Sequence, residues 1–165
     1  MRLDARASTV SASRDHGAVG PAPVAGDPPI WAGGMTPKAI ERAVRVADGF
    51  IFGTAGSEMM GQYAPGIRAA LAENGKPNGT VAGLAYVAVG DDPQAALAEG
   101  AHHVLRYYGQ LWTEPENLIH HGPVSKLAEE VAAYADALDV LILFPQIPDL
   151  RQVELLAEHV LPAYR

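Results

Sequence analysis

The sequence has no cysteine, and this absence excludes several kinds of site at once. Without a thiol there is no disulfide framework, no thiolate metal site and no catalytic cysteine. Basic residues are also scarce, because 12 Lys and Arg face 19 Asp and Glu and leave a net charge of −7. A chain this acidic has no basic patch that could follow a phosphate backbone, so we expect neither nucleic acid nor an anionic membrane as a partner.

Long apolar runs are absent as well. No stretch approaches the roughly 18 to 20 apolar residues of a membrane span, and the first residues lack the apolar core of a signal peptide. These absences predict a cytoplasmic protein. What the sequence does have is a hydrophobic share of 48 % in 165 residues, which is enough for the core of one ordinary domain.

The first 27 residues differ from the rest. They are rich in Ala, Ser, Gly and Pro and have no hydrophobic period, so they bury too little to offset the entropy of ordering them. We predict a flexible tail over residues 1–27 and a folded domain over residues 28–165. The alternative, an organelle transit peptide, rests on three arginines that two aspartates interrupt: Arg2, Arg6 and Arg14.

From Pro29 onward, strand and helix signals alternate, which is typical of βαβ units with a parallel sheet. The predicted strands are residues 30–33, 50–52, 80–89 and 140–144, each followed by a helix. The fourth is apolar throughout, so we expect both of its faces to be covered. Pro65 predicts a break in the second helix, and residues 110–121 have no clear period, so we predict a loop there with a possible short helix.

The first strand runs into two glycines and then a helix start. Gly33 and Gly34 allow a tight turn, Thr36 can cap the first helical turn, and Pro37 suits the first helical position. The unpaired N–H groups and the positive dipole end of such a helix suit a phosphate. The residue types alone favour a purely structural turn with no ligand.

Other polar and aromatic groups have structural alternatives. The pairs His102-His103 and His120-His121 suggest a metal, but adjacent helical side chains diverge by roughly 100° and no acidic cluster accompanies them, so we predict no metal. His120 or His121 could act as a general base, donate a hydrogen bond to a phosphate, or lie on a solvated loop. Asp92 fits a helix cap better than an acid/base pair. The aromatic cluster could stack on a ring or simply pack: Tyr107, Tyr108 and Trp112.

Taken together, these segments resemble the luciferase-like monooxygenases, which are flavin- or F420-dependent oxidoreductases built on a (β/α)8 TIM barrel. The resemblance is carried by residues 28–36, 47–51, 87–96, 122–145 and 154–162. It implies an α/β fold that corresponds to the C-terminal half of the barrel, strands five to eight. The chain would then be a natural half-barrel, a fragment of a longer ancestor or the product of a mistaken gene start.

The resemblance also implies site residues. It places the phosphate of FMN or coenzyme F420 on the loop after the first strand and lines the cofactor with the loop after the second strand: Gly33, Gly34, Met35 and Thr36, then Gly53 and Thr54. The implied activity is that of an oxidoreductase or monooxygenase acting on a small organic substrate. The substrate, the choice between FMN and F420, and the use of oxygen all stay open.

A half-barrel also has consequences for activity and assembly. Barrel active sites take residues from several strand ends, so we expect impaired turnover from this chain alone. The alternative is a module that binds cofactor or forms oligomers without catalysis, or a truncated remnant. The open sheet edges and the exposed apolar inner face of half a barrel predict a homodimer or a higher oligomer.

Overall fold

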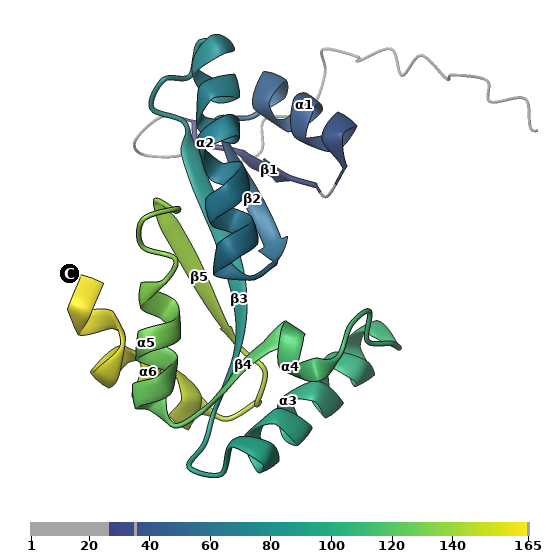
Figure 1. Ribbon diagram of the computed structural model, residues 1–165, viewed down its shortest axis with the longest axis vertical. Coiled ribbons are helices and arrows are strands. Elements are labelled where there is room, and N and C mark those ends of the chain that lie inside the picture. Colours follow the sequence, from purple (N-terminus) through teal and green to yellow (C-terminus); the bar gives the residue numbers. More distant parts are fainter. Residues whose placement is uncertain (1–26, 35, 165) are drawn as a thin grey trace, which may run out of the picture.

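The computed structural model describes residues 27–34 and 36–164. The predicted tail, apart from Asp27, and Met35 of the glycine loop lie outside the described residues. The described part is an α/β fold in which one parallel sheet alternates with helices (Figure 1). Its strands are β1 (Trp31–Gly33), β2 (Gly49–Thr54), β3 (Thr80–Val89), β4 (Ile119–Gly122) and β5 (Val140–Pro145).

The helices follow the strands in the expected order. They are α1 (Pro37–Val46), α2 (Ser57–Glu73), α3 (Pro93–Tyr108), α4 (Pro115–Leu118), α5 (Val124–Ala132), α6 (Leu150–His159) and the 3₁₀ turn η1 (Leu161–Tyr164). Predicted caps are present, since Thr36 accepts a hydrogen bond from the amide of Ala39 and Asp92 accepts from the amides of Gln94 and Ala95. No helix in the described ranges is both long and apolar enough to cross a membrane.

β3 is the centre of the sheet. Its first half pairs with β2 up to Leu84, and its second half pairs with β4 from Tyr86 onward, both along one edge. β5 pairs with the other edge of β3, and β1 pairs with β2. The strands β1, β2, β3 and β5 therefore form a four-stranded arc, and β4 lies beyond the end of β2 (Figure 1).

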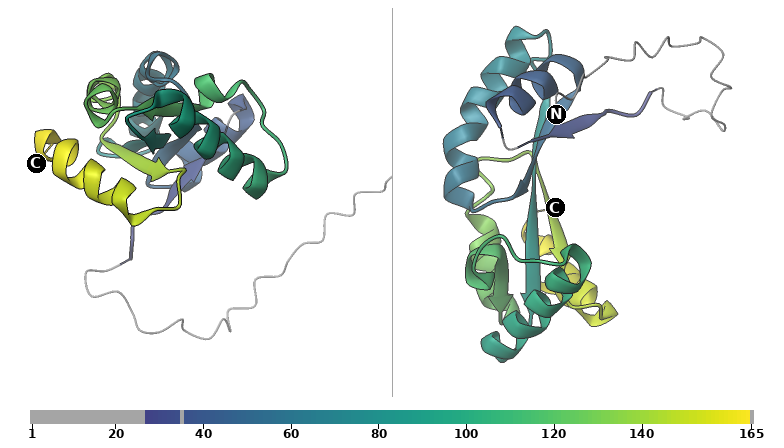
Figure 2. Two further views of the ribbon diagram at one scale, coloured as in Figure 1. Left: turned by 90° about the horizontal axis from the view of Figure 1, so that it is seen from below. Right: turned by 90° about the vertical axis from the view of Figure 1, so that its right-hand side faces the viewer.

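Two faces of this sheet differ in what covers them. We call the outer face the one that packs against α1, α2, α5 and α6, with Phe50, Val81, Val87 and Leu141 pointing toward these helices. We call the opposite face the inner face; α3 covers it only near the carboxyl end of β3 (Figure 2), where Tyr86 and Ala88 pack against Leu97 and Val104.

The inner face of β5 contradicts one expectation. Val140, Ile142 and Phe144 are 36 %, 39 % and 52 % exposed, although an apolar run of this kind predicts cover on both faces. The alternate residues, Leu141 and Leu143, pack on the outer face beneath α6. Both faces of this strand are apolar, but the described residues cover only the outer face.

Three further predictions about local structure were wrong. β4 lies in the segment predicted as a loop, and it brings the number of described strands to five. α2 runs unbroken through Pro65 because the proline is exposed while Ala64 and Ile67 anchor the helix to the core around it. The apolar spacing after Gly122-Pro123 predicts a helix to about Leu138, but the helix ends at Ala132 and the chain continues as turns.

α6 is fixed to the sheet by a buried amide. The capping-box pattern predicts that Gln152 bonds back to its own helix start, and Asp149 does cap through the amide of Arg151. The side chain of Gln152 instead bonds to Val89 at the end of β3: its Oε1 accepts from the Val89 amide at 2.7 Å, and its Nε2 donates to the Val89 carbonyl at 2.8 Å. Gln152 is 6 % exposed. Its amide bonds to both backbone groups of Val89, as a neighbouring strand would do at this position.

Candidate functional site

Loops that follow parallel strands meet at the carboxyl edge of the sheet, where α/β proteins build their sites. Gly33 ends β1 beside Ile51, and β2 continues to Thr54, which lies beside Leu84 of β3. Both predicted cofactor loops therefore follow strands at the same edge, with the second loop farther along the strand direction.

The loop after β1 starts a capped helix, as predicted. The carbonyl of Thr36 accepts from the amides of Ala39 and Ile40 at 2.9 and 3.0 Å, and its hydroxyl accepts from the Ala39 amide at 3.2 Å. Thr36 is exposed, and Lys38 follows it in the first turn. The backbone amides of Ala39 and Ile40 in the first turn of α1 are therefore already hydrogen-bonded within the chain.

The two glycines of this loop are also required by packing. A Cβ at Gly33 would lie 2.6 Å from the carbonyl oxygen of Ile51, and a Cβ at Gly34 would overlap the Cβ of Ala39. A side chain at either position would therefore push β1 from β2 or the loop from α1. Close packing is sufficient to explain both glycines without a ligand.

The loop after β2 has a different geometry. The pairing register shifts between Phe52 and Thr54, so Gly53 lies in an irregularity of the strand, and a Cβ added there would meet open space. Thr54 is half-buried. α2 then begins after Gly56, which caps it without a side-chain hydrogen bond.

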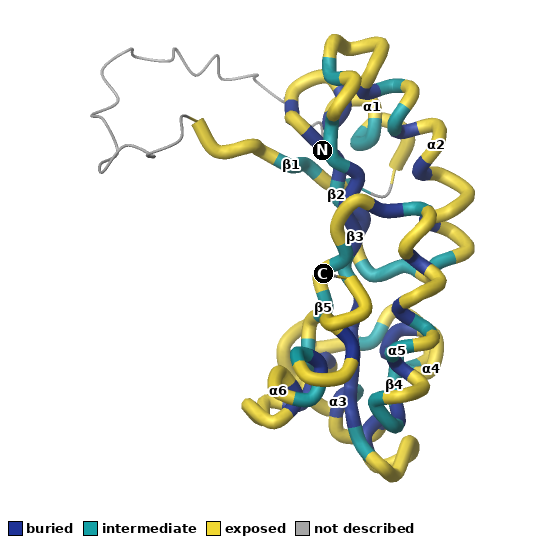
Figure 3. Tube along the Cα trace, turned by 90° about the vertical axis from the view of Figure 1, so that its left-hand side faces the viewer, coloured by how far each residue is buried: buried dark blue, intermediate teal, exposed yellow. Residues whose placement is uncertain are grey.

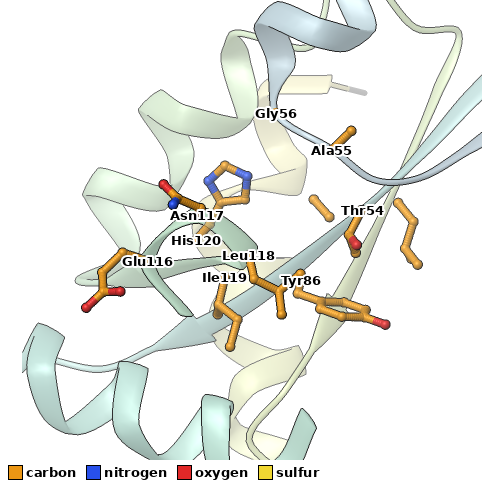
Figure 4. A pocket seen from close by; sticks show the side chains of 11 residues that line it. Thr54, Ala55, Gly56, Tyr86, Glu116, Asn117, Leu118, Ile119 and His120 are labelled. Atoms are coloured by element: carbon orange, nitrogen blue, oxygen red, sulfur yellow. The ribbon is translucent and has the colours of Figure 1, made fainter. Parts of the chain in front are cut away.

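A small cavity of about 50 Å³ lies between this loop and the start of β4 (Figure 4). It forms where β3 exchanges its partner, between Leu84 beside β2 and Tyr86 beside β4. Thr54 lines one side of it and His120 another. The structure thus brings two predicted site residues, 66 positions apart in the printed sequence, to one cavity.

His120 is held by hydrogen bonds at both ring nitrogens. Nδ1 lies 2.8 Å from Glu130 Oε2, and Nε2 lies 2.8 Å from the hydroxyl of Tyr134. That hydroxyl donates in turn to the carbonyl of Ala55 at 3.1 Å. This chain of contacts ties β4 to α5 and to the start of α2, and a general base at His120 would have to break one of its bonds.

Tyr134 is the buried centre of this network, with 1 % of its surface exposed. Burial raises the pKa of its hydroxyl, and the negative charge of Glu130 raises it further. Tyr134 therefore stays a neutral hydrogen-bonding group. Glu130 also forms an ion pair with Lys126, whose Nζ lies 3.3 Å from its Oε1. This network could not be predicted from the sequence, because its members are separated by up to 79 residues.

His121 has a different environment. Its Nδ1 lies 2.9 Å from the carbonyl of Ile119, which makes this nitrogen the donor. Successive side chains of a strand point to opposite faces, so His120 and His121 do not share a ligand position. In residues 27–34 and 36–164, no group of three or more His, Asp or Glu side chains is placed to hold a metal ion.

Aromatic side chains form a row from β5 to the end of α3. The rings of Phe144 and Tyr86 lie 5.8 Å apart, and the hydroxyls of Tyr86 and Tyr108 lie 2.8 Å apart. Trp112 packs edge-on against Tyr108 at 5.2 Å. Burial, and then the hydrogen bond with Tyr108, raise the pKa of Tyr86 above its ordinary value. The sequence indicated Tyr108 and Trp112 but not the two strand residues that join them.

Comparison with known proteins agrees with this fold. The sequence matches the model of the luciferase-like monooxygenases over residues 2–147, while no curated protein matches. Two similar solved structures are an F420-dependent secondary alcohol dehydrogenase in complex with an F420-acetone adduct (TM-score 0.66, 18 % identity) and the coenzyme F420-dependent tetrahydromethanopterin reductase from Methanopyrus kandleri (TM-score 0.63, 18 % identity). A third is the EDTA monooxygenase from Chelativorans sp. BNC1 (TM-score 0.60, 13 % identity).

The chain is much shorter than these neighbours. The alignments cover 84 %, 83 % and 87 % of this chain but 49 %, 51 % and 47 % of the three solved chains. The chain thus spans about half the length of the structures it resembles, which agrees with a partial TIM barrel. Because the family match extends over most of its residues, the chain belongs to the luciferase-like monooxygenases.

Proposed function

We propose that this chain is the part of a flavin- or F420-dependent oxidoreductase that holds the phosphate of FMN or coenzyme F420. The phosphate would lie on the loop of Gly33, Gly34, Met35 and Thr36, and the second loop, Gly53 and Thr54, would line the cofactor. Family membership supports this proposal, and so do neighbours whose names include F420 and a modified FMN.

One observation carries the location: α1 begins at the carboxyl edge of β1, next to a loop of two glycines. Lys38 adds an exposed cation to the first turn. The aromatic row and the uncharged side chains of the inner face suit a planar ring system. The close packing of both glycines means that this loop needs a direct test.

The cofactor, when bound, would supply the electron-transfer chemistry, and the chain would bind and orient it. Of the two candidate histidines, His121 is the better proton donor or acceptor. Only its Nδ1 is engaged among the hydrogen bonds of the described residues, whereas both nitrogens of His120 are engaged.

Binding can be tested without substituting a glycine. Lys38→Ala removes a cation at the first turn of α1, and Arg45→Ala removes one from the last turn of the same helix as a matched control. Isothermal titration with FMN, F420 and inorganic phosphate should give at least about fivefold weaker binding for Lys38→Ala alone, on the order of 1 kcal/mol. Equal affinities in both variants and the unmodified chain would remove this loop from the site.

A second candidate function is a module that binds cofactor or associates without turnover. The half-length coverage of the neighbours favours it, because barrel sites draw residues from strand ends around the whole ring. We expect low or no turnover with reduced FMN or F420 in a steady-state assay of this chain alone. Turnover at a rate of about 1 s⁻¹ or more would contradict the expectation.

A further inference from the structure

The strand residues of the inner face are uncharged, and β5 has no fully buried residue along its length, as its half-buried and exposed colours in Figure 3 show. The exposed side chains of β5 on this face are Val140, Ile142 and Phe144. Phe144 continues into the aromatic row, whose outer members at the end of α3, Tyr108 and Trp112, are each 49 % exposed. The patch is therefore continuous from β5 to the end of α3, and patches of this kind mark interfaces.

The arc of four strands also ends in two open edges. β1 pairs only with β2, and β5 pairs only with β3, within the described residues. All strands are parallel, so both edges run in the same direction. A rotation by 180° about an axis along the strands would place β5 of one copy beside β1 of another and keep every strand parallel.

We propose that a second copy of this chain covers the inner face, with the two arcs closing into one eight-stranded barrel around a two-fold axis. Four strands from each copy give the number at which inward side chains fill a barrel. Closed two-fold symmetry is the commonest arrangement of homo-oligomers. It joins both pairs of open edges and covers both apolar faces in one step.

The exposed apolar area fits such a dimer. The exposed aromatic and aliphatic side chains offer roughly 600 Å² per copy, taking about 200 Å² for each fully exposed aromatic residue. They are Val140, Ile142, Phe144, Tyr108 and Trp112, together with Tyr107, which is 77 % exposed and packs edge-on against Tyr108 at 4.7 Å. Two copies would bury roughly 1,200 Å² of apolar surface besides the strand edges, which reaches the lower bound for a stable, specific interface.

The dimer would also change the carboxyl edge. One barrel would carry two copies of the loop after β1 and two aromatic rows, so each site could take side chains from both chains. The association itself does not rest on the proposed cofactor, and its test uses no cofactor.

Sedimentation equilibrium of the full chain at micromolar concentration tests the proposal. We expect a species of twice 17.4 kDa. Ile142→Asp should weaken association by at least about 100-fold, because each copy would bury an unpaired carboxylate. The matched control, Val46→Asp, places the same charge on the exposed end of α1 and should leave the dimer unchanged.

Hydrogen exchange decides the case in which Ile142→Asp does not fold. In the unmodified chain, the amides of β1 and β5 should gain protection as the concentration rises from nanomolar to micromolar, while those of α1 should not change. A folded monomer at micromolar concentration would overturn the proposal. A dimer that survives Ile142→Asp with its circular dichroism intact, or that protects only the helices, would overturn it too.

Discussion

The outer and inner faces of the sheet carry apolar side chains from the same strands, yet only the outer one is a complete core. On the outer face, Phe50, Leu71 and Val81 are fully buried between β2, β3 and α2. On the inner face, Ile142 and Phe144 stay 39 % and 52 % exposed. Because burial, and not apolar character alone, stabilises a fold, the outer face should supply most of the stability of the isolated chain.

The largest expected effect tests this difference directly. Leu71→Ala should lower the free energy of unfolding by about 2 to 5 kcal/mol, because it leaves a cavity in the outer core. Ile142→Ala should cost less than about 1 kcal/mol at dilutions where the chain is monomeric, since its side chain is already partly in water. Urea denaturation of both variants measures the two values. Equal losses would mean that the inner face is as well packed as the outer.

The next effect concerns the amide that joins α6 to the outer side of β3. Gln152→Leu removes both hydrogen bonds to Val89 and leaves a buried amide and carbonyl unpaired, which costs about 1 to 3 kcal/mol. Arg151→Ala, on the neighbouring exposed position, is the control and should change stability by less than about 0.5 kcal/mol. A loss for Gln152→Leu no larger than that of the control would show that water replaces the amide.

The smallest effect depends on pH. Arg68 lies 2.7 Å from Asp139 and holds the pKa of that carboxyl below its ordinary 3.8, and the amide of Val81 contributes to the shift. A lowered pKa in the folded state adds stability above the unfolded pKa, and this stability is lost as the pH falls through the folded value. Both side chains are about 40 % exposed, so the effect should stay below about 1 kcal/mol.

Asp139→Asn should therefore be slightly less stable than the unmodified chain at pH 7. The difference should shrink as the pH falls below 3.8, because the unfolded chain then binds a proton at this carboxyl, and it should vanish below the lowered pKa of the folded state, where the folded carboxyl is uncharged too. Denaturation midpoints between pH 2 and pH 7 measure it. A difference that stays constant over this range would assign the effect to packing and not to the ion pair.

The sequence predicted the parts of the fold that depend on local chemistry. Strand and helix alternation and the caps at Thr36, Asp92 and Asp149 are confirmed, because each depends on residues within one turn of the chain. β4 was missed, since four residues, Ile-His-His-Gly, have too short a pattern, and pairing with distant β3 makes them a strand. The prediction that both faces of β5 are covered was wrong for a related reason. The sequence of the strand does not say which of its faces a helix packs against.

The candidate site was predictable only in part. The glycine loop was recognisable from residues 33–36, but the overlap of Gly34 with Ala39 is a matter of helix placement. The sequence also suggested His120 without its partners, because Tyr134 and Ala55 reach it from distant elements. Residue type therefore pointed to candidates, and the hydrogen-bond partners in three dimensions separated the engaged His120 from His121.

The central claim is that the carboxyl edge of β1 and β2 binds a flavin-type cofactor. Hydrogen-exchange mass spectrometry of the full chain, with and without saturating FMN or F420, tests it most directly. We predict added protection in residues 33–40 and 53–60 with FMN or F420, and no change in α6. Protection confined to other segments, or none at concentrations where titration detects binding, would contradict it.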